Sequence, residues 1–320
     1  QKTTQLILKG LVNHPNAVGV LVLGLGCENN NIPLFKTVLG DIDEERVRFM
    51  STQEHDDEVG DGLRLIAELV DYAKKQKRVE CKASELVIGL KCGGSDGFSG
   101  LTANPLIGRF SDKLIGVGGS TILTEVPEMF GAETILMNRC VDETIFEKTV
   151  HLINDFKDYF TSHNQVVYEN PSPGNKKGGI TTLEDKSLGC VQKSGSADVA
   201  DVIQIGSPVT RQGLNLLIGP GNDIVAVTNL TASGCHMILF STGRGTPVGA
   251  PVPTVKIATN SDLAKRKPHW IDFNAGKIIN GADLTDELFD YVLRVAGGEC
   301  TNNEKNGYRE ISIFKDGIVL

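Results

Sequence analysis

Two of the seven cysteines stand where an apolar run meets a glycine-rich loop. Cys27 follows the run "AVGVLVLGLG", and Cys92 ends the run "SELVIGLKC". Thiolates at such places can bind a soft or borderline divalent metal such as Fe(II) or Zn, and Glu28 and Asp96 lie nearby as further ligands or as a base. A second interpretation stays open, because a buried free cysteine is also a small apolar side chain and a carboxylate can cap a helix.

Polar loops of one composition follow several apolar runs. They combine Gly, Asn, Ser and Thr with isolated charges, in the stretches "GLGCENNN", "KCGGSDGFSGLTANP", "NPSPGNKKGGITTLEDKS", "FSTGRGTP" and "KIATNSD". Glycine lets the backbone approach a ligand and aim N–H groups at an anion. Each loop by itself is equally explained as a tight turn. None matches the dinucleotide fingerprint or the P-loop.

Two of these loops place a basic group where it can meet a carboxylate. Arg244 lies between two glycines in "TGRGTP", where it has no packing role, and a guanidinium binds a carboxylate through two hydrogen bonds. Lys176 lies in "NPSPGNKKGG", which is suited to cradle a carboxylate or a phosphate. Together the loops predict a site for a small acid at the carboxyl ends of parallel strands.

The elements that carry these loops alternate between strand and helix. Apolar runs predict strands within 17–30, 46–52, 84–92 and 120–133, and later in "GLNLLIG", "DIVAVTNLTASGCHMILFSTG" and "PTVKIAT". Helical spacing predicts helices over 57–77, with Val59, Leu63, Ile66 and Val70 on one side, and over 142–160 and 284–297. This alternation predicts a parallel α/β architecture. The pattern places a boundary near residue 85, giving domains 1–85 and 86–320.

Composition excludes several classes of protein. The formal net charge is −8 with no Lys/Arg run, which argues against a nucleic-acid partner. No apolar run approaches the roughly 20 residues that span a bilayer, so we expect no membrane segment. The scattered cysteines form no CxxC pair and predict free thiols in a reducing compartment. The chain begins with Gln1 rather than Met and carries no secretory signal, which predicts a processed or shortened gene product.

Taken together, the motifs resemble the altronate/galactarate dehydratase family. The resemblance rests on "GLGCENN", "CGGSDGFSGLTANP", "NPSPGNKKGGITTLEDKSLGC", "FSTGRGTP", "PTVKIATNSDL" and "HWIDFNAGKI". It extends through the spacers "RFSDKLIGVGGSTILTEVPEMFGAE", "EKTVHLINDFKDYF" and "NNEKNGYREISIFKDG", which are more similar to the altronate members than to the galactarate members. It covers essentially the whole chain.

The resemblance implies a fold and a reaction. The implied fold has an N-terminal β-clip domain, a middle domain linked to homodimerisation, and a C-terminal Rossmann-like domain with a mostly parallel sheet flanked by helices. This chain begins inside the middle region, so the β-clip domain is absent and a smaller α/β domain stands in front. The implied activity is an Fe2+-dependent dehydration of D-altronate to 2-dehydro-3-deoxy-D-gluconate in the bacterial cytoplasm, within hexuronate breakdown. Mn2+ is a possible replacement for the iron.

The implied reaction suggests roles for particular residues. We expect Cys27, Glu28 and Cys92 at the metal, with Asp96 as a further possible ligand, because a divalent metal stabilises the charge that develops when C2 loses its proton. The expected acid or base groups are Lys186, Lys193, His236 and Lys256. The expected substrate contacts are Ser95, Asp96, Ser99, Asn104, Asn175, Lys176, Thr242, Arg244 and Asn260. Glu184 and Asp185 flank Lys186 and, if close in space, would raise its pKa, which argues against Lys186 as a base.

Three functions follow as alternatives. The first is the dehydration of D-altronate. The second keeps the family but changes the substrate to galactarate, or to a sulfonated hydroxy acid cleaved at a C–S bond. The third is a non-catalytic binding or dimerisation fragment of such an enzyme.

Overall fold

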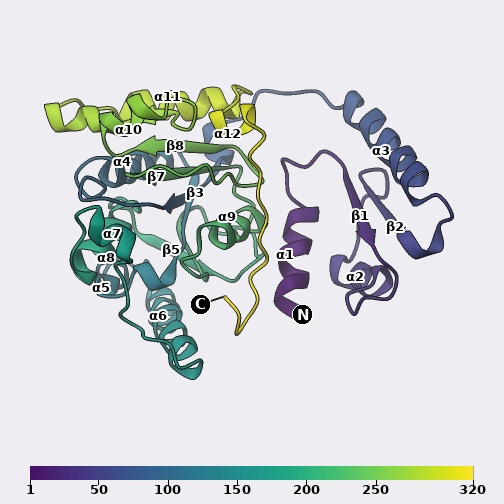
Figure 1. The fold of residues 1–320 in the computed structure, drawn as a ribbon, viewed down its shortest axis with the longest axis horizontal. Helices are drawn as coiled ribbons and strands as arrows, with labels where there is room; N and C mark the ends of the chain where they lie inside the picture. Colours follow the sequence, from purple (N-terminus) through teal and green to yellow (C-terminus); the bar gives the residue numbers. More distant parts are fainter. Residues whose placement is uncertain (320) are drawn as a thin grey trace.

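The computed structural model describes residues 1–319 as two parallel sheets with helices packed against them (Figure 1). The larger sheet has seven strands in the order β5-β6-β4-β3-β7-β8-β9, and the smaller pairs β1 with β2. The prediction of a mostly parallel α/β sheet with a smaller α/β unit in front is therefore confirmed. The strands are β1 Val20–Gly24, β2 Val47–Ser51, β3 Val87–Cys92, β4 Ser120–Leu123, β5 Val199–Ile203, β6 Gly213–Leu217, β7 Met237–Thr242, β8 Thr254–Ala258 and β9 Phe273–Asn274.

Helices cover both faces of the larger sheet. The α-helices are α1 Lys2–Val12, α2 Ile32–Leu39, α3 Glu58–Lys75, α4 Ala103–Gly116, α5 Glu133–Met137, α6 Glu143–Ser162, α7 Pro173–Lys177, α8 Leu183–Gln192, α9 Asp223–Ala232, α10 Ser261–Arg266, α11 Thr285–Ala296 and α12 Asn302–Lys305. One face packs against α4, which α8 and α11 cover in turn, and the other packs against α9, which α1 covers. Within residues 1–319, no helix is long and apolar enough to cross a membrane.

The central strands are buried on both faces, so their side chains alternate between two environments. In β3, Leu90 belongs to the core that includes α4, whereas Lys91 reaches toward the first residue of α9. Parallel register places Lys91 beside Phe240 of β7, and Phe240 beside Lys256 of β8. A row of two lysines and one aromatic ring therefore crosses three neighbouring strands.

The sequence pattern predicts a strand where the structure has α9. In the run "DIVAVTNLTA", every residue from Val225 to Ala232 is buried, so the sequence shows no polar stripe that would indicate a surface helix. The Asn222 side chain starts the helix by accepting a hydrogen bond from the Val225 N–H at 3.3 Å. The strand prediction is wrong there because a helix enclosed between a sheet and a second helix is apolar all round.

The smaller sheet forms a lobe with α2 and α3 beside it (Figure 1). Its core is small and contains Val12, Phe35, Leu39 and Val47. The predicted buried strand within 17–30 is β1, but its side chains are mostly half-buried or exposed. With only two strands, the sheet offers too little surface to bury the apolar side of a long helix, and its own two faces stay partly exposed.

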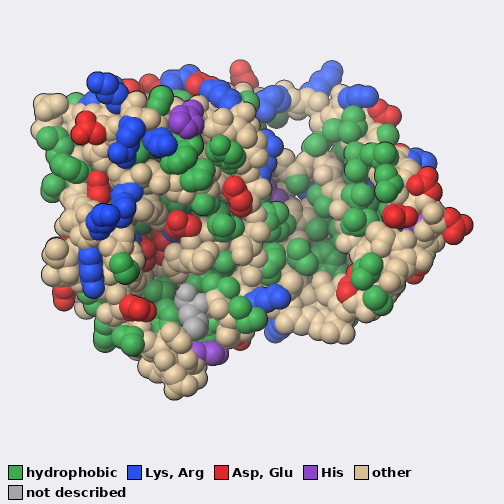
Figure 2. Space-filling model, in the orientation of Figure 1, with side chains coloured by type: hydrophobic (Ala, Val, Ile, Leu, Met, Phe, Trp, Pro, Cys, Tyr) green, Lys and Arg blue, Asp and Glu red, His purple; other side chains and the backbone are tan. Residues whose placement is uncertain are grey.

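The apolar stripe of α3 confirms the predicted helix but does not pack within the chain. Val59 and Leu63 are 65% and 61% exposed, and Ile66 and Val70 are exposed as well. Leu23 and Leu25, at the end of β1, are also exposed. Figure 2 shows hydrophobic side chains gathered on this lobe. The lobe therefore presents an apolar surface, defined by these six residues, that nothing in residues 1–319 covers.

Two side chains from the turn after α1 fasten the lobe to the larger sheet. The His14 Nε2 lies 3.1 Å from the Cys235 carbonyl oxygen, and the Asn16 side chain donates to the His236 carbonyl at 2.8 Å. An extended segment at 76–82 then connects α3 to the larger unit. The domain division near residue 85 stays a prediction.

Candidate active site

A thiol and two carboxylates meet at the carboxyl edge of the larger sheet. Cys92 is the last residue of β3, and Glu125 and Glu128 follow the neighbouring strand β4. All three are buried, and one ligand atom from each lies within 4.8 Å of the other two. The Cys92 Sγ is 3.3 Å from Glu128 Oε2 and 4.0 Å from Glu125 Oε2.

The chain after β4 is shaped to turn both carboxylates inward. Glu125 adopts a left-handed backbone conformation, with φ 71° and ψ 58°, which is uncommon for a residue other than glycine. Pro127 then stands in the first turn of a short 3₁₀ segment, Val126–Glu128, closed by a hydrogen bond from Glu128 N–H to the Glu125 carbonyl at 2.8 Å. Strained conformations of this kind concentrate at functional sites.

Three lysines surround this group. Lys91 contacts Glu125 Oε1, and Lys186 contacts Glu128 Oε1 at 2.8 Å. Lys193 lies 2.8 Å from Cys92 Sγ and 3.5 Å from Glu125 Oε2. Each carboxylate therefore has one oxygen held by a lysine and its second oxygen turned toward the Cys92 thiol.

Helix α8 and the C-cap residue that follows it supply two of these lysines. Lys186 and Lys193 are seven residues apart, about two helical turns, with Cys190 between them on the same side. The Thr182 side chain caps the helix by accepting from the Asp185 N–H at 3.1 Å. The spacing explains how one short helix aims both amines at Cys92.

Burial and charge pull the pKa values of this group in different directions. Burial, reinforced by Glu128, raises the pKa of the Cys92 thiol. Burial also opposes the charge of Glu128, but the ammonium groups of Lys186 and Lys91 outweigh it and hold its pKa at about 2. The pKa of Glu125 is raised, first by burial and then by Glu128. Burial likewise opposes the charge of Lys186, yet Cys92 and Glu128 raise its pKa above the ordinary value.

The donor set fits a divalent metal. One sulfur and two carboxylate oxygens, a soft and two hard ligands, lie close enough together to hold a divalent metal ion. The three ammonium groups balance the negative charge of these donors, and Lys193 lies on the side from which the donors converge. The residues that would hold a metal are therefore Cys92, Glu125 and Glu128.

Two cavities border this group. One, of about 350 Å³, has Cys92, Lys186, Ser95 and Asn104 on its wall. The other, of about 470 Å³, has Glu128 on its wall and lies against the segment before α7. The Ser95 Oγ is buried beside the first cavity and has no hydrogen-bond partner in residues 1–319, so it is free to bond a ligand hydroxyl.

The predicted contact Asp96 is used mainly to join loops. Its carboxylate accepts hydrogen bonds from Thr259 Oγ1 at 2.8 Å, from Asn260 Nδ2 at 3.0 Å and from Ser99 Oγ at 3.2 Å. A Cβ at Gly243 would lie 2.1 Å from the Asp96 Cγ, so this approach requires glycine. Asp96 therefore fastens the loops after β3, β7 and β8 to one another.

Other predicted substrate contacts also brace the loops. Asn104 donates to the Gly189 carbonyl at 2.8 Å and accepts from Ser241 Oγ at 2.7 Å. Thr242 Oγ1 accepts from the Gly245 N–H at 2.9 Å. Their roles as substrate contacts stay predictions.

The segment that contains α7 lies against the same loops. Asn175 donates to the Ser95 carbonyl at 3.1 Å, and Arg244 donates to the Gly174 carbonyl at 2.8 Å. Arg244 and Lys176 are exposed. The predicted carboxylate clamp at Arg244 therefore remains a prediction, with the guanidinium bonded to backbone here.

Two predicted metal ligands lie elsewhere. Cys27 is exposed and Glu28 is half-buried in the loop between β1 and α2, within the small lobe (Figure 1). The Glu28 carboxylate accepts hydrogen bonds from its own backbone N–H and from the Gly26 and Leu25 N–H groups, which lower its pKa. The structure does not bring this pair to Cys92, and we leave it out of the proposed site.

Two predicted acid or base groups also lie away from Cys92. Lys256 is enclosed on the face of the sheet that α9 covers, 3.5 Å from the centre of the Phe240 ring, with burial lowering its pKa to about 7. His236 precedes β7 and thus stands at the amino edge of the sheet, where its Nδ1 accepts from the Val87 N–H at 3.0 Å. We leave both out of the proposed site.

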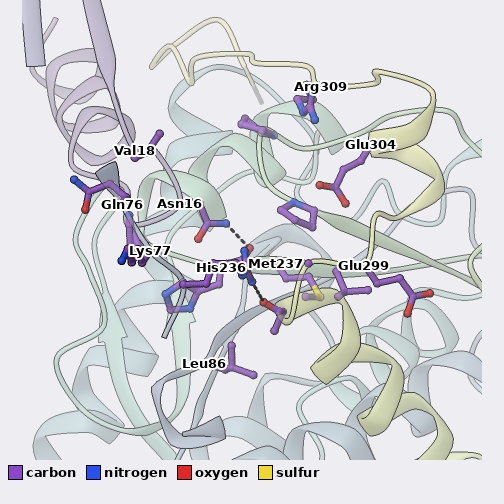
Figure 3. Close-up of a pocket in the computed structure, with 17 residues that line it drawn as sticks. Asn16, Val18, Gln76, Lys77, Leu86, His236, Met237, Glu299, Glu304 and Arg309 are labelled. Carbon is purple, nitrogen blue, oxygen red and sulfur yellow. Dashed lines mark hydrogen bonds between the residues drawn. The ribbon is translucent and has the colours of Figure 1, made fainter. Parts of the chain in front are cut away.

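His236 instead lines a cavity of about 690 Å³ between the lobe, the connecting segment and α11 (Figure 3). Asn16, Lys77 and Glu299 come to it from three separate parts of the chain. This cavity is larger than either cavity at the carboxyl edge, but no group of potential metal ligands faces it within residues 1–319.

Sequence reasoning missed four charged residues of the site. Glu125 and Glu128 stand in "LTEVPE", directly after a predicted strand, and Lys91 is a charge inside the apolar run "VIGLKC". Asp223, the fourth, bonds Lys91 at 2.8 Å. A charge within a fully buried strand and two acids after a strand were the available signals.

Comparison with known proteins defines the family. Residues 83–319 match the model of the D-galactarate/altronate dehydratase C-terminal domain. Residues 1–74 match the second domain of D-galactarate dehydratase/altronate hydrolase. The chain belongs to the D-galactarate/altronate dehydratase family, as the motifs predicted.

Three relatives show the extent of the similarity. The chain is 58% identical to the altronate dehydratase of Escherichia coli over 99% of its own length and 65% of that protein. It is 56% identical to the altronate dehydratase of Bacillus subtilis over 100% of its own length and 65% of that protein. It is 37% identical to a galactarate dehydratase (L-threo-forming) of Escherichia coli over 89% of its length and 57% of that protein. The chain thus spans about two thirds or less of these relatives.

Proposed function

We propose that this protein is a metal-assisted hydro-lyase that dehydrates D-altronate to 2-dehydro-3-deoxy-D-gluconate in hexuronate breakdown. The observation that carries the proposal is the buried thiol and carboxylate group, ringed by three lysines, beside a cavity of about 350 Å³. The identity of 56–58% to two altronate dehydratases supports this substrate over galactarate, where the identity is 37%.

The metal we propose is Fe2+, with Mn2+ as a replacement, held by Cys92, Glu125 and Glu128. A bound cation would withdraw charge from the substrate carboxylate and so acidify the proton on C2. The buried position of the three ligands excludes bulk water, which strengthens every charge interaction there.

We assign the donation of a proton to Lys186 of α8. Lys186 lines the cavity and is held as an ammonium ion by Glu128 and Cys92, so it can donate a proton to the C3 hydroxyl as it leaves. Lys193, next to the Cys92 Sγ, is kept as an ammonium ion because nearby acidic groups raise its pKa, so we assign it the stabilisation of negative charge rather than the acceptance of the C2 proton. The free Ser95 Oγ would bond a substrate hydroxyl.

We also propose that two copies pair through the apolar surface of α3 and β1. Replacing Leu63, 61% exposed at the centre of that surface, by Arg should convert a dimer into a monomer in analytical ultracentrifugation. The matched control is Ile279→Arg, which adds the same charge at an apolar residue exposed on the larger unit. A Leu63→Arg protein that sediments as the unchanged protein does would contradict the pairing. We further infer a cytoplasmic location, since all seven cysteines are free thiols.

The activity test is an anaerobic assay. The protein is incubated with Fe2+, a thiol reductant and either D-altronate, galactarate or a sulfonated hydroxy acid, and the 2-keto acid product is measured. The altronate dehydratase of Bacillus subtilis serves as the positive control. We expect turnover of D-altronate.

Two results would overturn this choice. Turnover of galactarate or of the sulfonated acid, but not D-altronate, would change the substrate. Binding of D-altronate without turnover, with activity restored by adding the relative's remaining N-terminal part, would assign this chain the role of a binding fragment.

A further inference from the structure

Lys91 comes to the site from the face of the sheet opposite to Cys92. Adjacent residues of a strand point to opposite faces, and the Lys91 side chain stands beside the Phe240 ring, 5.6 Å from its centre. Its ammonium nevertheless bends over the end of β3. There it donates to the Cys92 carbonyl at 2.6 Å, to Asp223 Oδ1 at 2.8 Å and to Glu125 Oε1.

These three acceptors use the full donor capacity of an ammonium group, which has three N–H bonds. Lys91 is completely buried, so bulk water does not compete for its hydrogen bonds. Asp223, 34% exposed at the start of α9, anchors the ammonium from the other side. The lysine is thus fixed in one position between two elements.

The fixed position of Lys91 determines which oxygen of Glu125 faces Cys92. With Oε1 held by Lys91, Oε2 is the oxygen that faces the Cys92 Sγ and Lys193. Lys186 holds Glu128 in the same way, by Oε1, and leaves its Oε2 toward Cys92. The left-handed backbone of Glu125 gives its side chain an unusual direction. Lys91 holds its Oε1, while the Cys92 N–H at 3.4 Å and Lys193 at 3.5 Å contact its Oε2.

We propose that Lys91, anchored by Asp223, is a positioning residue that sets one oxygen of Glu125 as a ligand for the metal. The inference rests on the metal site of the proposed function. Lys91 itself contacts neither substrate nor metal, because all of its donors are engaged. A lysine that only neutralised buried negative charge would have the same effect on metal binding whichever carboxylate oxygen it contacted. An experiment can therefore distinguish positioning from charge balance.

The test measures binding of Mn2+ by the decrease of its free electron paramagnetic resonance signal. Lys91→Met keeps most of the side-chain volume and removes the ammonium. We expect the dissociation constant for Mn2+ to rise about 10–100-fold, as loss of an outer partner of a metal ligand does. The matched control is Lys148→Met, which removes an ammonium paired with Asp201 at 2.8 Å away from the site, and should leave the constant unchanged within twofold.

The double variant Lys91→Met/Asp223→Asn separates positioning from charge balance. It removes one positive and one negative charge, so the net charge equals that of the unchanged protein. Positioning by Lys91 predicts that Mn2+ binding stays weak, and recovery of the affinity would overturn the inference.

The remaining outcomes are also decisive. Equal affinity of Lys91→Met and the unchanged protein overturns this inference alone. No saturable Mn2+ binding by the unchanged protein overturns the metal site and this inference with it. If circular dichroism shows that Lys91→Met does not fold, Asp223→Asn decides instead: weaker Mn2+ binding supports the inference, and unchanged binding refutes it.

Discussion

The two edges of the larger sheet carry cavities that differ in their chemistry. At the amino edge, the cavity of about 690 Å³ beside His236 is the larger, but the titratable groups on its wall are half-buried or exposed, and burial lowers the pKa of its histidine. At the carboxyl edge, a cavity of about 350 Å³ adjoins a thiol, two carboxylates and three lysines, all buried. The comparison teaches that convergent charge rather than cavity size marks the candidate site.

The reason lies in the parallel strands. Their carboxyl ends release several loops at one edge, so residues distant in the sequence meet there. Glu125 follows β4 and Asp223 follows β6, while Lys91 and Cys92 end β3. At the amino edge, by contrast, the chain enters the strands from helices and from the lobe. Contacts there join the two units, as the hydrogen bond from Asn16 to the His236 carbonyl does.

The largest expected effect is the loss of metal affinity at the carboxyl edge when Cys92 is replaced. Cys92→Ser removes the sulfur ligand and should lower Mn2+ affinity by more than the roughly 10–100-fold expected for an outer partner. Cys27→Ser, at the exposed cysteine of the small lobe, is the matched control and should leave the affinity unchanged. Titration of both variants with Mn2+ checks this. Unchanged affinity in Cys92→Ser would remove the thiol from the site.

The second effect concerns the buried charges. Lys186→Met leaves Glu128 without its 2.8 Å partner, and breaking a buried ion pair costs about 3–5 kcal/mol in the free energy of unfolding. Urea unfolding at pH 7 measures it. The double variant Lys186→Met/Glu128→Gln should recover much of the loss, because no unpaired charge remains. A loss below about 1 kcal/mol would mean that Lys186 does not stabilise Glu128, since exposed pairs contribute that little.

A smaller effect is expected where the loops meet. Gly243→Ala places a Cβ against the Asp96 carboxylate, and an overpacked site typically costs about 1–3 kcal/mol. Gly116→Ala, where no atom lies within 4 Å of the added Cβ, is the control and should change little. Thermal unfolding compares the two. Equal melting temperatures would show that the loops after β3 and β7 can move apart without cost.

The smallest effect belongs to the amino edge and depends on pH. His14 Nδ1 accepts from the Asn16 N–H and His236 Nδ1 from the Val87 N–H, so protonation of either ring destroys an acceptor. Burial lowers the pKa of both below 6.5; Arg46 and the second histidine add to this at His14, and Glu85 opposes it at His236.

The sign follows from linkage. The unfolded chain binds these protons more readily, so the stability that the neutral rings provide is complete above pH 6.5 and declines as the pH falls below it. His14→Asn retains a side-chain acceptor that does not titrate and should reduce the loss of melting temperature between pH 7.5 and 5.5. The same loss in both proteins would exclude His14 as its cause. Glu128 at the carboxyl edge should not respond in this window, because its pKa is about 2.

Patterns within single segments predicted much of the fold. The strand ending at Cys92 and the helix over 142–160 are present as β3 and α6, because their apolar spacing is a local property. α9 escaped prediction because a helix buried all round lacks a periodic pattern. The stripe on α3 was also read correctly as a helix, but its exposure depends on how little the two-stranded sheet can cover.

The site was predicted less completely. Cys92, Lys186 and Lys193 were identified and do lie together, whereas the roles given to Cys27, Glu28 and His236 are not supported by proximity to them. Cys92, Cys27, Glu28 and His236 stand at a strand end or in a loop, and the sequence does not say which end of the sheet a loop will reach. Strand order and direction decide that.

By itself, the sequence determined the family and the α/β class, and it predicted the loop "LKCGGSDGFSGLTANP" as one wall of the candidate site. Only the tertiary structure decided that Glu125, Glu128 and Lys91 complete it, and that one oxygen of each carboxylate is held by a lysine while the second faces Cys92. The physical reason is that motifs and hydrophobic periodicity depend only on residues close to one another in the sequence. The meeting of β3, β4 and α8, by contrast, depends on the order in which seven parallel strands pair.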